Sequence, residues 1–330
     1  MTITNARLRR RDGLWAIRLD GGHIAAVVPQ TDGRPGEGNP GSSGASPSAD
    51  NAVLDAGGAL VTEGFVNGHL HLCKVGTLSL VGDAALAEYH GHDMGGAARA
   101  IELARNVKTH YRRDRLLPPI RRAVERAVVY GTSHMRAFAD TDTAADLEGV
   151  RAVMQVRDEF RDRIDIQVVA FPQDGLTRDP GAGRLVRRAM EEGADVVGGI
   201  PWIEHTDRAA QHHIDTMLDL AVEMDAPVSM LVDDAGDASL RTLEMLAVAT
   251  IERGLQHRVV AHHARAMAMY PEPTRRRLFG LLTEAGIGVV SDPHTGPLHA
   301  DIDGLRAAGI PVGLGQDDIN DAYYPFGRNN

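Results

Sequence analysis

The arrangement of hydrophobic and polar positions changes near residue 62, and the two parts of the chain predict different structures. Before this point, short apolar runs are separated by Gly-Gly and Asp-Gly pairs, which is typical of strands joined by tight turns. The predicted strands cover residues 15–19, 23–28 and 52–55. Residues 32–50 are rich in Gly, Pro and Ser and have almost no apolar side chains. The sequence therefore predicts a small β segment over residues 1–62, with a disordered loop at 32–50.

Beyond residue 62, apolar runs recur, and each is followed by an amphipathic helical stretch. Uninterrupted apolar strands are buried on both faces, as in a parallel sheet covered by helices. Eight such alternations predict an α/β fold, a (β/α)8 TIM barrel over residues 63–330. A doubly wound open sheet is the alternative, but no Gly-x-Gly-x-x-Gly motif follows the first strand. The predicted strands cover residues 64–72, 128–140, 164–173, 194–201, 226–234, 258–263, 286–293 and 311–318.

Composition and charge narrow the range of functions. The formal net charge of −10 disfavours nucleic acid as a partner, because phosphate binding needs a basic surface, and it suits a small-molecule substrate. A single cysteine, Cys73, excludes an internal disulfide and fits a reducing compartment. The polar, Arg-rich start lacks the apolar stretch of a signal peptide, and no run of about 18 apolar residues predicts a membrane span. We therefore expect a cytoplasmic protein without a membrane or nucleic-acid partner.

Polar residues that can bind a metal ion stand at most of the predicted strand ends, where the active site of a barrel lies. His69 and His71 end the first strand, and because side chains alternate along a strand, both point to the same side. Two imidazoles in this arrangement can bind one divalent metal ion, although a bare His-x-His also occurs by chance. The other polar strand ends are His134, Arg136 and Asp140; Gln173 and Asp174; Asp233 and Asp234; His262 and His263; Asp292 and His294; Gln316, Asp317 and Asp318.

Two of these strand-end residues complete a plausible cluster with the histidine pair. They are His263 and Asp317, for which the alternatives are a core histidine and a helix N-cap. His262 should point to the other side of its strand and have a structural role. Gln173 either binds the amide edge of a ring or is a turn residue. Lys74, beside the histidine pair, is either a solvated lysine or a carbamate or substrate partner.

Several motifs occur in an order that points to a known family. They are GFVNGHLHL at residues 64–72, VAFPQDG at 169–175, GADVVGGIP at 193–201, and GQDD at 315–318 followed by DAYYPFG at 321–327. Together they resemble the motifs on the first, third, fourth and eighth strands of the amidohydrolase superfamily, and within it those of cytosine deaminase. The resemblance runs from about residue 52 to residue 330.

The resemblance implies a metal-dependent hydrolase that acts on C–N bonds other than peptide bonds and deaminates a nucleobase-like or cyclic amidine substrate. It implies one divalent metal ion, zinc or iron, a small-molecule substrate, and a chain that can form a homo-oligomer. A histidine at the position of His263 holds the water that attacks the substrate. The implied site residues are His69, His71 and Asp317 as metal ligands, Asp234, His263 and Asp317 as catalytic residues, and Gln173 and Asp318 as substrate-binding residues.

Some departures from the family pattern alter the expected site. Leu231 stands where the family has a histidine ligand on the fifth strand, and leucine cannot ligate a metal ion. Asp234 stands where the family has a proton-carrying glutamate, and its side chain is shorter by about 1.5 Å. Phe138 replaces a second-strand histidine of many relatives. The family also continues past the eighth strand, so we expect the C-terminal β segment to be missing and the barrel truncated, leaving the N-terminal strands with an open edge.

Three functions remain compatible with the sequence. The first is a metal-dependent hydrolase, in which His69, His71 and Asp317 bind the metal ion, His263 can move in, and Asp234 is the general acid and base. The second is a non-catalytic or degraded homologue that lacks a complete metal site and acts as a binding protein. The third is a non-haem iron oxygenase, because two histidines and one carboxylate form its facial triad. Metal content and oxygen-dependent turnover distinguish them.

Overall fold

The computed structural model describes residues 1–30, 52–80, 104–293, 296–321 and 323–324. The loop predicted to be disordered, at residues 32–50, lies outside the described residues. The chain divides into two compact units, Met1–Gly64 and Phe65–Asn330, so the boundary falls at residue 64 where the sequence predicted 62. Within the described ranges, no helix is both long and apolar enough to span a bilayer.

The first unit is a small sheet in which β1 is central. It pairs antiparallel with β2 and parallel with β4 and β5, and β2 pairs antiparallel with β3. The three strands predicted here are present, while β1 and β5 had no clear apolar run to indicate them. The strands are β1 (Thr2–Leu8), β2 (Arg11–Asp20), β3 (His23–Gln30), β4 (Val53–Asp55) and β5 (Leu60–Val61).

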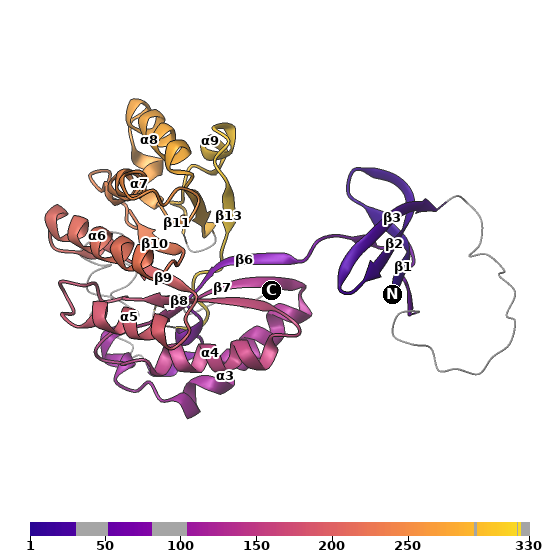
Figure 1. Ribbon diagram of the computed structural model, residues 1–330, viewed down its shortest axis with the longest axis horizontal. Helices are drawn as coiled ribbons and strands as arrows, with labels where there is room; N and C mark the ends of the chain where they lie inside the picture. Colours follow the sequence, from indigo (N-terminus) through magenta and orange to yellow (C-terminus); the bar gives the residue numbers. More distant parts are fainter. Residues whose placement is uncertain (31–51, 81–103, 294–295, 322, 325–330) are drawn as a thin grey trace, which may run out of the picture. The chain divides into compact units, whose positions relative to one another are not determined.

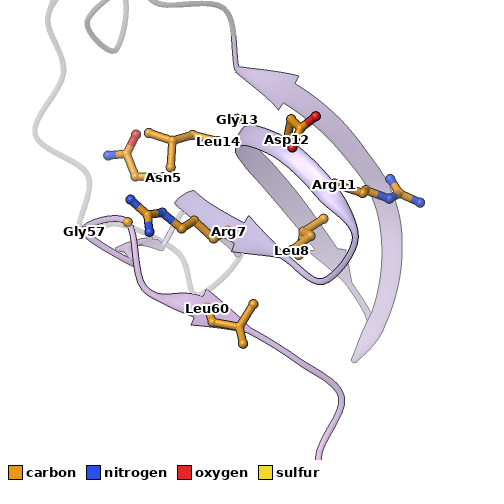
Figure 2. A pocket seen from close by; sticks show the side chains of 10 residues that line it. Asn5, Arg7, Leu8, Arg11, Asp12, Gly13, Leu14, Gly57 and Leu60 are labelled. Atoms are coloured by element: carbon orange, nitrogen blue, oxygen red, sulfur yellow. The ribbon is translucent and has the colours of Figure 1, made fainter.

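A hollow of about 650 Å³ lies on this first unit, between β1, the β1–β2 turn and the segment around Gly57 (Figure 2). Arg7, Asp12, Leu14 and Leu60 contribute to its lining. The described residues that line it include no histidine or cysteine. The hollow therefore lacks the imidazole and thiolate donors that most zinc and iron sites use.

The second unit contains the eight parallel strands predicted from the sequence, with helices between them (Figure 1). They follow one another in chain order from β6 to β13, as expected for a (β/α)8 barrel, and the prediction of this fold is confirmed. The strands are β6 (Phe65–Leu70), β7 (Thr132–Asp140), β8 (Asp165–Phe171), β9 (Val196–Gly199), β10 (Val228–Val232), β11 (Val259–His263), β12 (Gly288–Ser291) and β13 (Val312–Leu314).

The last strand approaches the first at residues that the sequence assigned to the site. The backbone N–H of Gln316 donates to the carbonyl of His69 at 2.8 Å, and that of His71 donates to the carbonyl of Asp317 at 2.7 Å. Gly315 permits this approach, because a Cβ there would collide with the Cβ of His69 and with Asp292. The bonds that close the barrel therefore also bring the first-strand histidines to Asp317.

The helices cover the outside of the strands, and α6 illustrates how the sequence positions them. It begins at Asp207 because the hydroxyl of Thr206 accepts the N–H of Ala209 at 3.1 Å, which is an N-cap. Its buried face includes Ile214 and Leu218, as the helical spacing predicts. The helices are α3 (Arg113–Val129), α4 (Glu148–Phe160), α5 (Ala182–Glu191), α6 (Asp207–Glu223), α7 (Thr242–Glu252), α8 (Glu272–Ala285) and α9 (Ile302–Ala307), with short 3-10 turns η2 (Leu72–Lys74), η3 (Thr77–Leu80), η4 (Pro201–Ile203) and η5 (Arg265–Met269).

Two apolar clusters lie on opposite faces of the barrel strands. The larger cluster packs strand residues such as Met230 and Val232 against the helices. The smaller cluster takes the alternate positions, including Leu231. Its other fully or nearly buried members are Ala104, Phe138, Val169, Phe171, Val196, Ile200, Trp202, Ile203, Ala235 and Tyr323. The rings of Phe138 and Phe171 in this smaller cluster pack against His69 and His71, respectively.

Candidate metal centre

Three imidazoles approach one oxygen of Asp317 at the carboxyl ends of the barrel strands. Nε2 of His69 lies 3.3 Å from Asp317 Oδ1, Nε2 of His71 lies 3.7 Å from it, and Nε2 of His263 lies 3.8 Å from it. All four residues are at least nine-tenths buried. The structure therefore brings together four residues that the sequence assigned to the site and that are far apart in the chain.

The backbone at two of these strand ends is left-handed. His263 has φ of 66° and Asp317 has φ of 67°, in a region that residues with a Cβ enter at a cost of about 1–2 kcal/mol. Because the chain turns sharply at each position, the two side chains leave the regular alternation of the strand and face each other. Strain of this kind is common at functional sites.

The same turn explains why one prediction is wrong. His262 was expected to point away from the site, yet its Nδ1 lies 2.9 Å from Nδ1 of His69, and its ring packs against Phe138. Regular alternation places His262 inside the barrel together with Leu231, its partner on β10. His263 then faces the site as well, because its left-handed conformation turns it back.

Two of the three imidazoles are held in a way that suits metal binding. Nδ1 of His263 lies 2.9 Å from a carboxylate oxygen of Asp292, and Nδ1 of His69 contacts His262. A proton on Nδ1 that is donated to such a partner leaves the lone pair of Nε2 free, which is how metal-binding histidines are usually oriented. Nε2 of His69 is buried and has no aligned hydrogen bond among the described residues.

His71 is held differently, by the ammonium group of Lys74. Nζ of Lys74 lies 3.1 Å from Nδ1 of His71, and it also donates to Oε1 of Gln173. An ammonium group can only donate, so this contact makes Nδ1 of His71 the acceptor. A metal ion that binds Nε2 of His71 therefore requires a proton on Nδ1 and a change in this contact.

Charges within the cluster shift the protonation of its members. Burial lowers the pKa of His263, but Asp234, Asp317 and Asp292 outweigh it and raise this pKa to about 9. Burial raises the pKa of Asp317, but His263, His69 and His71 outweigh it and hold this pKa well below its usual value. Without a metal ion, an imidazolium at His263 and a carboxylate at Asp317 thus stabilise each other.

Asp234 lies at the edge of this cluster and is paired with Arg265. Nε of Arg265 lies 2.5 Å from Oδ1 of Asp234, and its Nη2 lies 3.6 Å from Oδ2 of Asp317. Nδ1 of His263 lies 3.8 Å from the same oxygen of Asp234. The neighbouring carboxylate has a structural role, since Asp233 accepts the backbone N–H of Thr242 at 2.7 Å and so caps α7.

Asp318 and Gln173, the predicted substrate-binding residues, are both buried at the same end of the barrel. Burial, followed by the charges of Asp321 and Asp317, raises the pKa of Asp318 well above its usual value. Its Oδ1 is buried and has no hydrogen-bond partner among the described residues. Asp318 is therefore prepared to carry a proton, and Gln173 is oriented by Lys74.

Leu231 contributes an apolar surface where the family pattern has a ligand. Its side chain is almost fully buried in the smaller apolar cluster, together with Phe138 and Phe171. The ring of Phe138 lies 4.1 Å from that of His69, between centroids. One side of the cluster is therefore closed by hydrocarbon.

The donor atoms fit a divalent metal ion. The ligand atoms of His69, His71 and Asp317 all lie within 4.8 Å of one another. Two ligands about 2.0–2.1 Å from one tetrahedral ion lie about 3.3 Å apart, close to the measured separations from Asp317. Imidazole nitrogens with one carboxylate are a donor set that suits zinc or iron.

Two residues of this centre had no role in the sequence analysis. Asp292 was noticed only as a polar strand end, and Arg265 was not noticed at all. The position of Asp292, directly after β12, was the available signal. Nothing local indicated Arg265, because its contacts with Asp234 and Asp317 span 31 and 52 positions of the chain, respectively.

Comparison with known proteins agrees with this geometry. A sequence profile described as the amidohydrolase family matches residues 52–330. N-isopropylammelide isopropyl amidohydrolase of Pseudomonas sp. (strain ADP) is 28% identical, covering 100% of this chain and 77% of that protein. Pterin deaminase of Rhizobium rhizogenes is 27% identical over 220 residues, covering 61% of this chain and 48% of that protein.

Solved structures show the same relationship. The structure of 5-methylcytosine deaminase from Klebsiella pneumoniae with 5-fluorocytosine matches with a TM-score of 0.85 and 30% identity, covering 100% of this chain and 78% of that one. N-isopropylammelide isopropylaminohydrolase from Burkholderia multivorans matches with a TM-score of 0.80 and 26% identity, covering 99% and 77%. With this fold, these strand-end residues and these relatives, the chain belongs to the amidohydrolase family, whose members here are hydrolases of C–N bonds.

Proposed function

We propose that this chain is a metal-dependent deaminase of a nucleobase-like ring or cyclic amidine. In this reaction water adds to a ring carbon, and ammonia or an amine leaves from the same carbon. The observation that carries the proposal is the approach of three imidazoles to Asp317 at 3.3, 3.7 and 3.8 Å, at the end of a barrel where active sites lie.

In this proposal His69, His71 and Asp317 hold one divalent metal ion, zinc or iron. When bound, such an ion supplies Lewis acidity, which polarises the substrate and makes a water molecule a good nucleophile near neutral pH. The hydrocarbon of Leu231 and Phe138 keeps bulk water from one side of the centre, which strengthens the electrostatic interactions there.

The neighbouring side chains would bind the ring and move protons. Gln173, oriented by Lys74, keeps its amide N–H groups available for an acceptor on the ring. Asp318, with its raised pKa, can donate its proton to a ring nitrogen or carbonyl oxygen. Asp234 takes a proton from water and returns it to the leaving nitrogen, and to do so it must loosen its ion pair with Arg265.

The relatives support a ring substrate without naming it for this chain. The similar proteins are called a 5-methylcytosine deaminase, a pterin deaminase and an N-isopropylammelide amidohydrolase, and each name refers to a nitrogen-containing ring. We propose that this protein works in the cytoplasm, in keeping with its single cysteine, and on a small molecule, in keeping with its acidic charge. We also propose that it can form a homo-oligomer, as the resemblance to the family implies.

Metal content tests this proposal first. We expect about one equivalent of zinc or iron in the purified protein by elemental analysis. A screen for ammonia or amine release should then use cytosine, 5-methylcytosine, pterins and N-alkylated aminotriazines. Absence of metal together with absence of turnover on all of these would contradict the proposal.

A second candidate is a non-catalytic homologue that binds a small molecule. Two observations favour it, namely the apolar Leu231 at the position of a ligand and the ion pair between Asp234 and Arg265. The variant Leu231→His separates the two candidates. If the parent protein holds no metal ion and the variant holds a full equivalent, the change on β10 has silenced the site.

A further inference from the structure

We propose that Trp202 is a specificity-determining residue of the candidate site, where its indole N–H donates a hydrogen bond to an acceptor on the substrate ring. The inference rests on the proposed function and adds a chemical feature of the substrate, namely a ring carbonyl oxygen or an unprotonated ring nitrogen. Trp202 lies in the 3-10 turn η4, which directly follows β9 in the barrel.

The indole nitrogen of Trp202 is a buried donor. Only 6% of this residue is exposed, and its Nε1 forms no hydrogen bond with any described residue. A buried tryptophan N–H usually has an acceptor, because a donor that is removed from water and left unpaired costs free energy. Trp15, the other tryptophan of the chain, follows this rule, since its Nε1 donates to the carbonyl of Asp12 at 3.0 Å. The N–H of Trp202 is therefore available to an acceptor on a bound molecule.

The neighbours of Trp202 place it beside the candidate metal centre. It belongs to the smaller apolar cluster, together with Phe171 and Leu231. The ring of Phe171 packs against that of His71, with 5.3 Å between centroids. The turn η4 also packs against β10, the strand that carries Leu231. Trp202 is thus part of the hydrocarbon surface against which a planar ring can pack.

Hydrogen bonds on both sides of the turn hold Trp202 in place. The N–H of Ile200, which precedes the turn, donates to Nε2 of His213 at 3.0 Å. Nδ1 of the same imidazole lies 2.8 Å from a carboxylate oxygen of Glu204, which follows the turn. Because one buried imidazole links both flanks, the backbone of the turn is fixed before a ligand binds. A donor held in this way discriminates between ligands, since a ligand without an acceptor leaves it unpaired.

The adjacent strand β8 leads to a second donor. Glu204 also accepts the backbone N–H of Leu176 at 2.7 Å, so it connects η4 to the loop that carries Gln173. The side-chain oxygen of Gln173 accepts from Lys74, which leaves the amide N–H groups of Gln173 for a ligand. Two donors after adjacent strands favour a ring with acceptors along one edge, such as a carbonyl oxygen beside a ring nitrogen.

Binding of matched rings tests this inference. The probes carry no amino group, so the protein cannot deaminate them: pyrimidin-2-one, uracil and cyanuric acid have a ring carbonyl, and pyrimidine has none. Equilibrium dialysis compares the parent protein with Trp202→Phe, which keeps an aromatic ring and removes the N–H. We expect the variant to bind the carbonyl-bearing rings about 10-fold or more weakly, and pyrimidine within about threefold of the parent.

Tryptophan fluorescence gives a second readout, which depends on the position of the indole. The chain contains two tryptophans, and Trp15 lies in the first unit. Trp15→Phe therefore leaves Trp202 as the single tryptophan, and pyrimidin-2-one should change its emission in a saturable manner. Trp202→Phe, which keeps Trp15, is the matched control and should show no such change.

Circular dichroism shows whether each variant is folded. If Trp202→Phe does not fold, the emission of Trp15→Phe decides the question. Its midpoint should then lie at a concentration of pyrimidin-2-one about 10-fold or more below that of pyrimidine. Equal midpoints, or an unchanged emission at saturation, would overturn the inference.

The outcomes separate the inference from the proposed function. If the parent binds carbonyl-bearing rings, and Trp202→Phe binds them as tightly while the emission of Trp202 stays unchanged, the inference is overturned and the proposed function stands. If the parent binds none of these rings, the inference is overturned as well, and the screen for ammonia or amine release then decides whether the proposed function survives.

Discussion

Two buried clusters of charged side chains lie at the same end of the barrel, and they reach electrical balance in different ways. In one, which we call the lysine cluster, the ammonium group of Lys108 donates to Asp142, donates to Asp174 at 2.7 Å and lies 3.7 Å from Asp140. In the other, the candidate metal centre, three imidazoles surround Asp317. In the first cluster a lysine ammonium group, which can only donate, balances the carboxylates, whereas in the second most of the groups around Asp317 are imidazoles, whose nitrogens can bind a metal ion once they are deprotonated.

The comparison shows that short distances between donor atoms do not by themselves identify a metal site. Asp142, Asp174 and Asp179 also bring oxygens within 4.8 Å of one another. However, Lys108 and Arg105 already pair with them, at 2.7 Å to Asp174 and 3.2 Å to Asp179. Buried carboxylates need a counter-charge, and here the chain supplies it. A metal ion is expected instead where imidazole lone pairs face a carboxylate, as Nε2 of His69 and Nε2 of His71 face Asp317.

The largest expected effect comes from removing the shared ligand of the metal centre. Asp317→Asn should lose the bound metal ion and reduce turnover about 1000-fold or more, because Lewis acidity contributes several kcal/mol to the transition state. Elemental analysis and ammonia release measure both. Asp162→Asn, at a carboxylate with an exposed fraction of 94%, is the matched control and should behave like the parent. Full metal retention in Asp317→Asn would contradict the assignment.

Removal of the cation from the lysine cluster should lower the stability of the protein and leave its metal content unchanged. Lys108→Met leaves several buried carboxylates without their cation, so the free energy of unfolding should fall by about 3–5 kcal/mol in urea titrations. The folded fraction should keep its metal ion. Arg161→Met, at an exposed cation, should change stability by no more than about 0.5 kcal/mol. A small loss in Lys108→Met would mean that the lysine cluster is not balanced by Lys108.

Removal of the metal ion should lower the stability of every variant whose metal centre is intact, including Lys108→Met. A chelator should lower the free energy of unfolding by about 2.7 kcal/mol if the ion was present at about 100 times its dissociation constant. Differential scanning calorimetry with and without chelator measures this loss. His69→Ala should show no further loss with chelator, and Lys108→Met should show the full loss. Equal responses in both variants would remove the distinction between the two clusters.

A third buried pair, Glu204 with His213, extends the comparison to pH. Burial raises the pKa of Glu204, but hydrogen bonds from His213 at 2.8 Å and from Thr177 outweigh it and lower this pKa from 4.5 to about 2. The folded state therefore binds the proton less readily than the unfolded state. The resulting stability, about 2 kcal/mol after allowance for solvent screening, is present above pH 4.5 and is lost as the pH falls towards 2.

The variant Glu204→Gln tests this dependence. Its stability deficit against the parent in urea titrations should be constant above about pH 4.5 and should shrink at lower pH. Glu252→Gln, at an exposed carboxylate on α7, should show no such trend. A deficit that grows as the pH falls would have the wrong sign for a lowered pKa.

Much of the fold could be predicted because its signals are local. Apolar runs followed by amphipathic stretches indicated all eight barrel strands, and the structure confirms them with shorter bounds, for example Val228–Val232 within residues 226–234. The strands β1 and β5 were missed, because Thr2–Leu8 mixes polar and apolar residues and Leu60–Val61 is too short for periodicity to register. These two strands form because they pair with each other and with other strands of the sheet, and their own composition does not indicate them.

The sequence predicted which residues of the candidate site can bind a metal ion, but it predicted fewer of the contacts between them. The histidine pair and Asp317 stand at strand ends in the sequence, and the structure brings them together. The direction of His262 was predicted wrongly, because alternation along β11 does not account for the left-handed turn at His263. Neither the hydrophobic pattern nor the motifs of the sequence indicated the pairing of Asp234 with Arg265.

The sequence by itself determined the order of the strands, the chemical types of the donors, and the end of the barrel at which they gather, because these follow from periodicity and from the position of residues along each strand. Only the tertiary structure decided which donors face one another and which are already paired. Asp292 behind His263, Arg265 beside Asp234, and Lys108 among its carboxylates come from distant parts of the chain. The physical reason is that side-chain direction at a strand end depends on a single backbone turn, and the balance of buried charge depends on neighbours that only the closed barrel provides.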